Sequence, residues 1–303
     1  MKNIMKYIII TIIFIFIYKL FFKKKKKVYE KVSDYPILET PIYHIGLAKC
    51  GTTSTANMFG KHIFATHDYK ELELLGHLYR YLNKEIDIYT VAKYLKEREN
   101  INGKIIQFDS TGQYIIFYKE LYKLNPNAKY IFTFRNMYDW MNSAFNYQLN
   151  RCEKHCDTEE FRLYLRLEYN MWNIMLKKIG HIHENHRLSN LNKKNANIMD
   201  FIHNFWNKRI DSIVAIQCHI VTEFLNFAKN KKNIIIIPLK KLSSKKTLKK
   251  LGIFTGVKGL TKSHSNKNEA YKKTLNKRKF IKSFTTYKTP EIIELYKKYN
   301  LNN

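Results

Sequence analysis

The chain has 303 residues and a formal net charge of +29 at pH 7, with 54 lysines and arginines against 25 aspartates and glutamates. Its 45% hydrophobic and 15% aromatic content fits a packed globular protein and argues against a disordered chain. The charge favours a polyanionic partner such as nucleic acid, an anionic membrane or an acidic polysaccharide, or it is compositional drift on solvated faces.

The N-terminal segment predicts a membrane anchor. Residues 8–22 are almost wholly apolar, and with residues 4–7 they approach the roughly 20 residues that a membrane helix needs. No small-residue cleavage site follows, which favours an uncleaved anchor over a signal peptide. The lysines after the segment favour a cytosolic domain, whereas a short tail before a short anchor is typical of a luminal one. We predict four parts: a tail at 1–7, a transmembrane anchor at 8–22, a basic stem at 23–40 and one domain at 41–303.

Apolar strands alternate with helices through the rest of the chain. We expect strands at 42–46, 105–108, 129–134 and 233–238, and helices at 52–60, 114–124, 138–149, 159–179, 213–229, from 248 and at 291–299. A polar segment rich in Asn, His and Lys interrupts this pattern between about 180 and 199. The alternation predicts an α/β fold of three layers, α/β/α, with a central parallel sheet. Ligands of such sheets bind at the carboxyl ends of the strands.

A glycine-bounded loop, Gly46–Ser54, lies between the first strand and the first helix. Its spacing, G-x-x-x-x-G-T-T, is that of a phosphate-binding P-loop, in which backbone N–H groups at a helix start bind an anion. The usual lysine position is taken by Thr52, and the lysine comes earlier, at Lys49. This departure suggests a nucleotide without a γ-phosphate. For Thr53 and Ser54, ordinary capping of the helix is the alternative.

A second anion site is predicted where the strand at 129–134 ends. Arg135 follows this strand, and Ser143 lies eight residues later in the next helix. A guanidinium and a hydroxyl that converge would suit a second phosphate. The competing interpretation is that Arg135 pairs with Asp139 and caps that helix.

The four cysteines say little about redox chemistry. Cys50 lies in the predicted phosphate loop, and Cys152 and Cys156 are spaced so that they either pair or remain thiols. A zinc site around His155 is disfavoured because structural zinc sites usually have two clear ligand pairs. No metal is expected.

Together, the two anion motifs resemble those of the sulfotransferase family that uses 3′-phosphoadenylyl sulfate (PAPS). Within this family, the sequence most resembles the membrane-anchored carbohydrate sulfotransferases. The resemblance covers about residues 41–303, and Met137 stands where the family often has proline. It implies that a loop binds the 5′-phosphosulfate, with the matching residues Lys49, Cys50, Gly51, Thr52, Thr53 and Ser54. It also implies a 3′-phosphate site formed by Arg135 and Ser143. A late loop that closes on the nucleotide is matched by His264, Asn266 and Lys267.

The resemblance also implies catalytic roles. Lys49 would stabilise the leaving phosphate oxygen, and a glutamate after the first helix would act as base. Glu71 is the first choice, Glu73 the second, and His67 is held in reserve because other sulfotransferases use histidine. Asp109 stands where carbohydrate-type members carry a lysine, and it could itself serve as the base. The alternative for these glutamates is a solvated helix face.

The predicted function is sulfuryl transfer from PAPS to a hydroxyl or amine of a carbohydrate, by a single-pass membrane protein facing the Golgi or secretory lumen. The basic surface would suit an anionic glycan, and we do not expect nucleic acid as a partner. One alternative is a P-loop kinase or NTPase, for which Asp109 would be the strand-end carboxylate. The other is a basic membrane-tethered nucleic-acid-binding protein, which only charge and aromatic content support.

Overall fold

The computed structural model divides the chain into two units, residues 1–35 and 36–303. It describes residues 38–180, 197–263 and 273–301, all of which belong to the second unit. The predicted tail and anchor and most of the stem lie outside the described residues, as do His264, Asn266 and Lys267 and most of the polar segment. No helix within the described ranges combines the length and the apolar character needed to span a bilayer.

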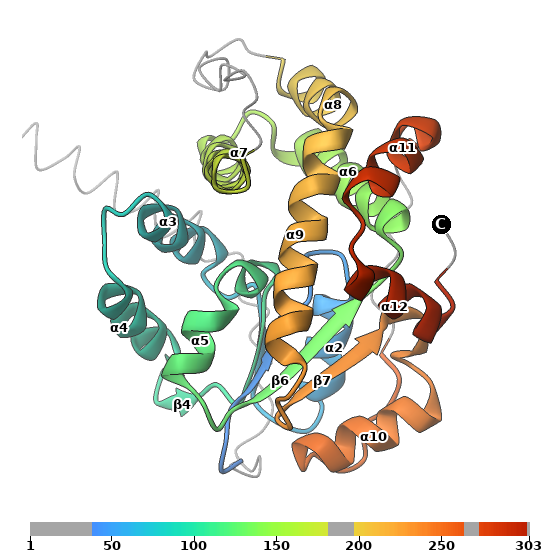
Figure 1. Ribbon diagram of the computed structural model, residues 1–303. Coiled ribbons are helices and arrows are strands. Elements are labelled where there is room, and N and C mark those ends of the chain that lie inside the picture. Colours follow the sequence, from blue (N-terminus) through green and yellow to red (C-terminus); the bar gives the residue numbers. More distant parts are fainter. Residues whose placement is uncertain (1–37, 181–196, 264–272, 302–303) are drawn as a thin grey trace, which may run out of the picture. The chain divides into compact units, whose positions relative to one another are not determined.

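A five-stranded sheet forms the centre of the second unit (Figure 1). All of its strand pairs are parallel, and the order is β2-β5-β1-β6-β7, which puts β1 in the middle. The strands are β1 (Ile42–His44), β2 (Ala65–His67), β5 (Phe108–Ser110), β6 (Lys129–Phe134) and β7 (Ile234–Pro238). Their carboxyl ends therefore meet at one edge, where the predicted phosphate loop and Arg135 both follow their strands.

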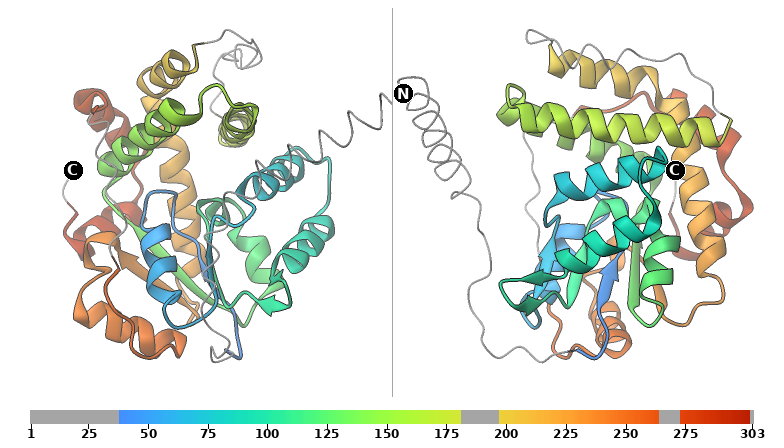
Figure 2. Two further views of the ribbon diagram at one scale, coloured as in Figure 1. Left: turned by 180° about the vertical axis from the view of Figure 1, so that it is seen from behind. Right: turned by 90° about the vertical axis from the view of Figure 1, so that its left-hand side faces the viewer.

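Both faces of the sheet are buried under helices, as a parallel sheet requires. Along β6, Tyr130 and Phe132 belong to one core cluster, and the ring centre of Phe132 lies 4.4 Å from that of Phe224 in α9 (Ile210–Ala228), with the two rings tilted. Ile131 belongs to a second cluster, formed with α2 (Thr52–Phe59) and α10 (Lys245–Thr255). Figures 1 and 2 show these helices on opposite sides of the sheet. The predicted parallel α/β fold in three layers is confirmed.

The remaining helices surround this core. They are α3 (Glu71–Leu82), α4 (Ile88–Arg98), α5 (Tyr118–Leu124), α6 (Met137–His155), α7 (Glu159–Lys178), α8 (Ile198–Lys208), α11 (Lys277–Tyr287) and α12 (Pro290–Tyr299), with short 3₁₀ turns η1 (Gly112–Ile116) and η3 (Leu239–Lys241). Helix α3 packs against α7, α6 against α8, and α9 against both α11 and α12. The strand β2 and the helices α3, α4, α8 and α11 have no counterpart among the predicted elements.

The predicted strand at 105–108 is wrong in its bounds. Residues Lys104–Ile105 (β4) pair antiparallel with Asn100–Ile101 (β3), and the sheet strand begins only at Phe108. Asn102 and Gly103 connect β3 and β4 with φ values of 53° and 82°. An Asn-Gly pair with both φ angles positive is the preferred two-residue hairpin turn, so the local turn separates these residues from the sheet.

The predicted helix at 114–124 is two elements. A 3₁₀ turn, η1, ends at Ile116, and α5 begins at Tyr118. Phe117 between them has φ −124° and is buried in the core. Burial of this large side chain against the core takes precedence over helix continuity.

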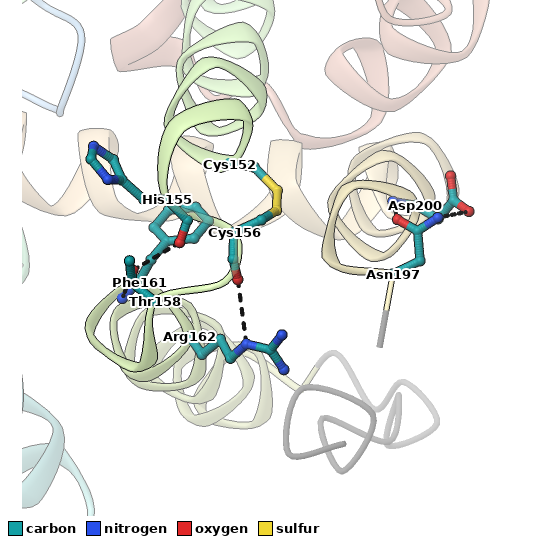
Figure 3. The surroundings of a disulfide bond; sticks show 8 residues. All are labelled: Cys152, His155, Cys156, Thr158, Phe161, Arg162, Asn197 and Asp200. Carbon is teal, nitrogen blue, oxygen red and sulfur yellow. Dashed lines mark hydrogen bonds between the residues drawn. A yellow bond between two sulfur atoms is a disulfide. The ribbon is translucent and has the colours of Figure 1, made fainter. Parts of the chain in front are cut away.

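Cys152 and Cys156 form a disulfide at the end of α6, which settles the alternative that the sequence left open (Figure 3). The turn into α7 is held by side chains close to this bond. Arg162 donates through Nε to the Cys156 carbonyl at 3.3 Å, and the Thr158 hydroxyl donates to the His155 carbonyl at 2.8 Å. Because the cysteines are bonded to each other, they do not form a zinc pair.

Candidate active site

The loop between β1 and α2 adopts a conformation that its glycine makes possible. Lys49 has φ 66° and Gly51 has φ 95°, and both values are in the left-handed region. A Cβ at Gly51 would lie 2.6 Å from Cδ1 of Leu239. Gly51 is also the N-cap of α2 and has no side chain to satisfy the first-turn N–H groups. The start of α2 therefore has the arrangement of an anion-binding helix terminus.

Three hydrogen bonds hold the backbone of this loop. Trp140 Nε1 donates to the Ala48 carbonyl at 2.7 Å, the Thr133 hydroxyl donates to the Cys50 carbonyl at 2.5 Å, and Cys50 N–H donates to the Leu47 carbonyl at 2.9 Å. Burial raises the pKa of the Cys50 thiol to about 12, so this side chain stays protonated and neutral. Cys50 therefore contributes its backbone to the loop rather than a reactive thiolate.

His67 lies at the end of β2 and contacts the loop hydroxyls. Its Nε2 lies 3.0 Å from the Thr52 hydroxyl, 3.1 Å from the Thr53 hydroxyl and 3.1 Å from Asp68 Oδ2. Burial lowers the pKa of His67 to about 4, so the ring is neutral at physiological pH and its contact with Asp68 is not an ion pair. In this position His67 orients the loop hydroxyls.

Arg135 stands at the carboxyl end of β6, next to β1 in the sheet. Burial lowers the pKa of Lys49, and the positive charge of Arg135 lowers it further. Two cations so close together favour an anion between or beside them. Ser143 lies half-buried in α6, on the helix that starts just after Arg135.

The alternative role of Arg135 as a helix cap does not hold. The side chain of Asn136 caps α6, accepting from the Asp139 N–H at 3.2 Å. Among the described residues, no ion pair joins Arg135 to Asp139. The guanidinium is therefore not used to hold the helix start.

Glu71 is the candidate base that the structure places best. It opens α3, its Oε1 accepts from Gln113 Nε2 at 3.1 Å, and its Oε2 lies 3.7 Å from Arg151 Nη1. Burial, reinforced by the charge of Asp68, raises the pKa of Glu71 to about 7. A carboxylate with this pKa can take up a proton near neutral pH, as a general base must.

Glu73 lies on the surface instead. Its side chain is 56% exposed and pairs with Lys70 at 3.3 Å. Glu73 therefore lies on a solvated helix face, which was the predicted alternative to a catalytic role. The geometry therefore favours Glu71 over Glu73.

Asp109 is enclosed by hydrogen-bond donors. It forms a buried ion pair with Arg98, and it accepts from the Thr66 hydroxyl at 2.9 Å and the Tyr114 hydroxyl at 2.5 Å. With its lone pairs engaged, this carboxylate is not placed to accept a substrate proton. It is also not available to hold Mg²⁺ for the kinase or NTPase alternative.

Sequence reasoning missed the residues that hold Glu71 and the loop. Gln113 and Arg151 come from η1 and α6, far from Glu71 in the chain, so no local spacing marks them. His44, buried in β1, contributes ring nitrogens 2.9 Å from the Ser110 hydroxyl and 2.7 Å from the Thr133 hydroxyl. Across the described part of the chain, no three His, Cys, Asp or Glu side chains cluster to hold a metal.

A family model described as "Sulfotransferase domain" matches residues 42–222. The chain belongs to the sulfotransferase domain family. The match runs from β1 into α9 and so includes the loop, Glu71, Arg135 and Ser143, whereas β7 and α10 to α12 lie beyond it. The family expected from the sequence is confirmed at this level.

Two solved structures are similar to this sulfotransferase domain. The sulfotransferase from Alicyclobacillus acidocaldarius has 13% identity and a TM-score of 0.41, with 88% of this chain and 98% of that chain covered. The sulfotransferase domain from the curacin biosynthetic pathway has 14% identity and a TM-score of 0.40, with 88% and 99% covered. No sequence among the curated proteins compared with the chain matches it.

The role of Asp109 in this sulfotransferase domain can be tested by measuring the free energy of unfolding. We expect Asp109→Asn to lower the free energy of unfolding by about 3 kcal/mol, because it leaves the buried Arg98 guanidinium without its charge partner. Urea unfolding measures the change, with the exposed Asp157→Asn as the control. An unchanged unfolding midpoint together with lost activity would instead indicate that Asp109 is catalytic.

Proposed function

We propose that this sulfotransferase uses PAPS as its donor and transfers the sulfuryl group to an acceptor hydroxyl. One observation carries the proposal. The loop that holds Lys49 and the cation Arg135 follow two adjacent parallel strands, β1 and β6, so both reach the same edge of the sheet. Two cationic anion sites side by side suit a nucleotide with phosphates at its 5′ and 3′ positions.

The loop would bind the 5′-phosphosulfate. Backbone N–H groups at the start of α2 and the hydroxyls of Thr52 and Thr53 would contact its oxygens, and Lys49 would neutralise the bridging phosphate oxygen. Arg135 and Ser143 would bind the 3′-phosphate. His264, Asn266 and Lys267 remain predicted contacts of the nucleotide from the late loop.

In the proposed reaction, the acceptor oxygen attacks sulfur in line with the bond to the 5′-phosphate. The new oxygen–sulfur bond forms as the sulfur–phosphate oxygen bond breaks, and the acceptor proton passes to the Glu71 carboxylate. The product nucleotide, 3′-phosphoadenosine 5′-phosphate (PAP), leaves with the negative charge that Lys49 stabilises. The sulfuryl group carries a single charge, and no metal is expected in this scheme.

Acceptor and location remain proposals from the sequence. A carbohydrate hydroxyl or amine is the acceptor class that the family resemblance implies. The proposed location of the domain is the Golgi or secretory lumen, where residues 8–22 would attach it to the membrane. The Cys152–Cys156 disulfide supports a luminal domain, because disulfides persist in oxidising compartments.

The donor is tested with two nucleotides that differ only in the 3′-phosphate. We expect the full chain in detergent to bind PAP about 10- to 100-fold more tightly than adenosine 5′-phosphate, since a charged hydrogen bond to phosphate has that value. We expect Arg135→Ala to remove most of this difference and to bind adenosine 5′-phosphate as the wild type does. Isothermal titration calorimetry measures both affinities.

The matched control is Arg80→Ala, which removes an arginine that is 51% exposed and pairs with Glu85 on the surface. It should leave the preference for PAP intact. Equal affinity of the wild type for the two nucleotides, or a preference that survives in Arg135→Ala, would contradict the proposed 3′-phosphate site.

A further inference from the structure

Glu168 lies in the wall of a cavity beside the loop between β1 and α2, and the reaction proposed above gives it no role. The cavity measures about 70 Å³, and Glu168 of α7 lines it together with Lys49 and Gln113. Tyr147 and Tyr164 add two phenol groups to the same wall. A carboxylate withdrawn from water is costly unless neighbouring groups stabilise it. The contacts of Glu168 therefore decide what its charge acts on.

Donors on α6 and α7 fix the carboxylate of Glu168. Gln148 Nε2 donates to Glu168 Oε2 at 2.9 Å. The Gln148 amide is itself oriented, because its Oε1 accepts from the Tyr169 hydroxyl at 2.6 Å and from Trp206 Nε1 at 2.7 Å. The Tyr164 hydroxyl, one turn earlier in α7, also donates to Glu168. All of these donors are neutral, so they hold the carboxylate in place without cancelling its charge.

Arg151 of α6 lies in the field of two carboxylates. Its Nη1 lies 3.7 Å from Glu71 Oε2, and this nitrogen makes no hydrogen bond to any described residue. Burial lowers the pKa of Arg151, but two phenol groups, Glu71 and Glu168 together raise it above its ordinary value. Burial and the charge of Glu71 raise the pKa of Glu168 to about 7, and Arg151 opposes them. The single guanidinium therefore serves both carboxylates.

Aromatic rings hold Arg151 in position. Its guanidinium carbon lies 4.3 Å from the ring centre of Tyr164, 5.5 Å from that of Phe161 and 5.6 Å from that of Tyr147. A planar guanidinium on aromatic faces has little freedom to turn toward one partner alone. Helix α3 packs against α7, which brings Glu71 and Glu168 to the same cation.

We propose that Glu168 is a positioning residue of this site: it shares Arg151 with Glu71, and so leaves Glu71 a better proton acceptor than a guanidinium of its own would. The inference rests on the proposed role of Glu71 as the base, and it deepens that role. One cation cannot fully neutralise two carboxylates, so each of them raises the affinity of the other for a proton. Glu168 acts through this charge balance and not by contact with the reacting atoms.

The other groups that face Glu71 do not duplicate this arrangement. They are Asp68 and His67 beside β2, Gln113 of η1, and Tyr147 and Tyr164 of α6 and α7. His67 is neutral, and burial raises the pKa of both phenols far enough to keep them neutral as well. Asp68 carries charge, but it has Arg98 and the Thr111 hydroxyl as further partners. The effect of Glu168 can therefore be separated by changing Glu168 alone.

The test measures the titration of Glu71 directly and needs no acceptor. The full chain in detergent is labelled with ¹³C at the glutamate side-chain carboxyls, and NMR follows these resonances with pH. The resonance that is missing from Glu71→Gln belongs to Glu71. We expect Glu168→Gln to lower the midpoint of Glu71 by about one pH unit, the order of effect of a neighbouring charge at a partly buried site. The matched control, Glu160→Gln, changes an exposed glutamate at the start of α7 and should leave the midpoint unchanged.

The coupling is mutual, which supplies a second measurement. Glu168 is the other described glutamate whose pKa is raised, so its resonance is recognised by a midpoint near that of Glu71. In Glu71→Gln, the Glu168 midpoint should fall by the same amount as the Glu71 midpoint falls in Glu168→Gln. Arg151→Gln should raise both midpoints, because it removes the shared cation.

The rate should show the same effect. With PAPS and N-acetylglucosamine as the probe acceptor, Glu168→Gln should raise kcat/KM about fivefold at pH 6, because more of Glu71 is deprotonated there. It should give no gain above the midpoint, since a weaker base is not a faster one. A purely structural defect would instead lower the rate at every pH.

Failures of the two proposals are distinguishable. If PAP does not bind the wild type, the proposed donor is wrong, and the NMR titration still decides the role of Glu168. If the Glu71 midpoint is the same in the wild type and in Glu168→Gln, the role of Glu168 is overturned whatever the donor is. If Glu168→Gln does not fold, an unchanged Glu168 midpoint in Glu71→Gln overturns it equally.

Discussion

Lys49→Ala is expected to lower kcat by about 10²- to 10³-fold, the usual effect of removing one group that stabilises developing charge. The side chain is half-buried near Arg135, and its Nζ lies 4.3 Å from the centre of the Tyr147 ring. In the transition state of the proposed reaction, negative charge grows on the phosphate oxygen that leaves sulfur, and Lys49 is the cation of the loop. Steady-state rates at saturating PAPS and acceptor measure the effect.

The backbone should tolerate this change. Alanine and lysine both carry a Cβ, so the strain of φ 66° at this position is the same in the variant. The control is Lys70→Ala, which removes a lysine with 43% side-chain exposure and φ 50°. If Lys49→Ala and the control Lys70→Ala both keep the wild-type kcat, Lys49 has no role in the proposed mechanism.

Glu71→Gln is expected to lower kcat/KM by about 10²- to 10⁴-fold, the range for loss of a general base. Because only the deprotonated carboxylate accepts the acceptor proton, wild-type activity should rise with pH through the Glu71 pKa of about 7. The residual activity of Glu71→Gln should lose this rise. The pH dependence of kcat/KM measures both effects.

Stability separates this role from a structural one. The pKa of Glu71 is raised from its ordinary 4.5, so the folded state binds a proton more tightly than the unfolded state does. Its contribution to stability is present below about pH 4.5 and is lost as pH rises through about 7. At pH 8, Glu71→Gln should therefore be no less stable than the wild type.

The control for this prediction is Glu73→Gln, two residues away in the same helix. Glu73 is exposed and pairs with Lys70, so neither the rate nor its pH profile should change. If Glu73→Gln loses activity and Glu71→Gln does not, the base has been assigned to the wrong glutamate.

Features that rest on neighbouring residues could be predicted from the sequence. The strand at 129–134 matches β6 at both ends, because an unbroken apolar run in a parallel sheet is buried on both faces. The position of the loop between β1 and α2 could be predicted because glycine positions and a following helix are local signals. The place of Arg135 at the carboxyl edge of the sheet could be predicted because it directly follows β6.

Features that depend on distant residues could not be predicted. The environment of Glu71 comes from Gln113 and Arg151, and the ion pair of Asp109 comes from Arg98 in α4. The start of α11 is marked by an Asn276 cap, whose side chain accepts from the Lys279 N–H at 2.9 Å. In a chain this rich in asparagine, such a cap does not stand out.

Contacts within the protein hold the loop between β1 and α2 in place. Hydrogen bonds from Trp140 and Thr133 fix the carbonyls of Ala48 and Cys50, and Leu239 packs where a Gly51 side chain would lie. A site that is ordered before binding loses little conformational entropy when the ligand arrives. Donor binding at this edge should therefore proceed without a slow loop-ordering step, and substitutions that weaken it should act mainly by speeding nucleotide dissociation.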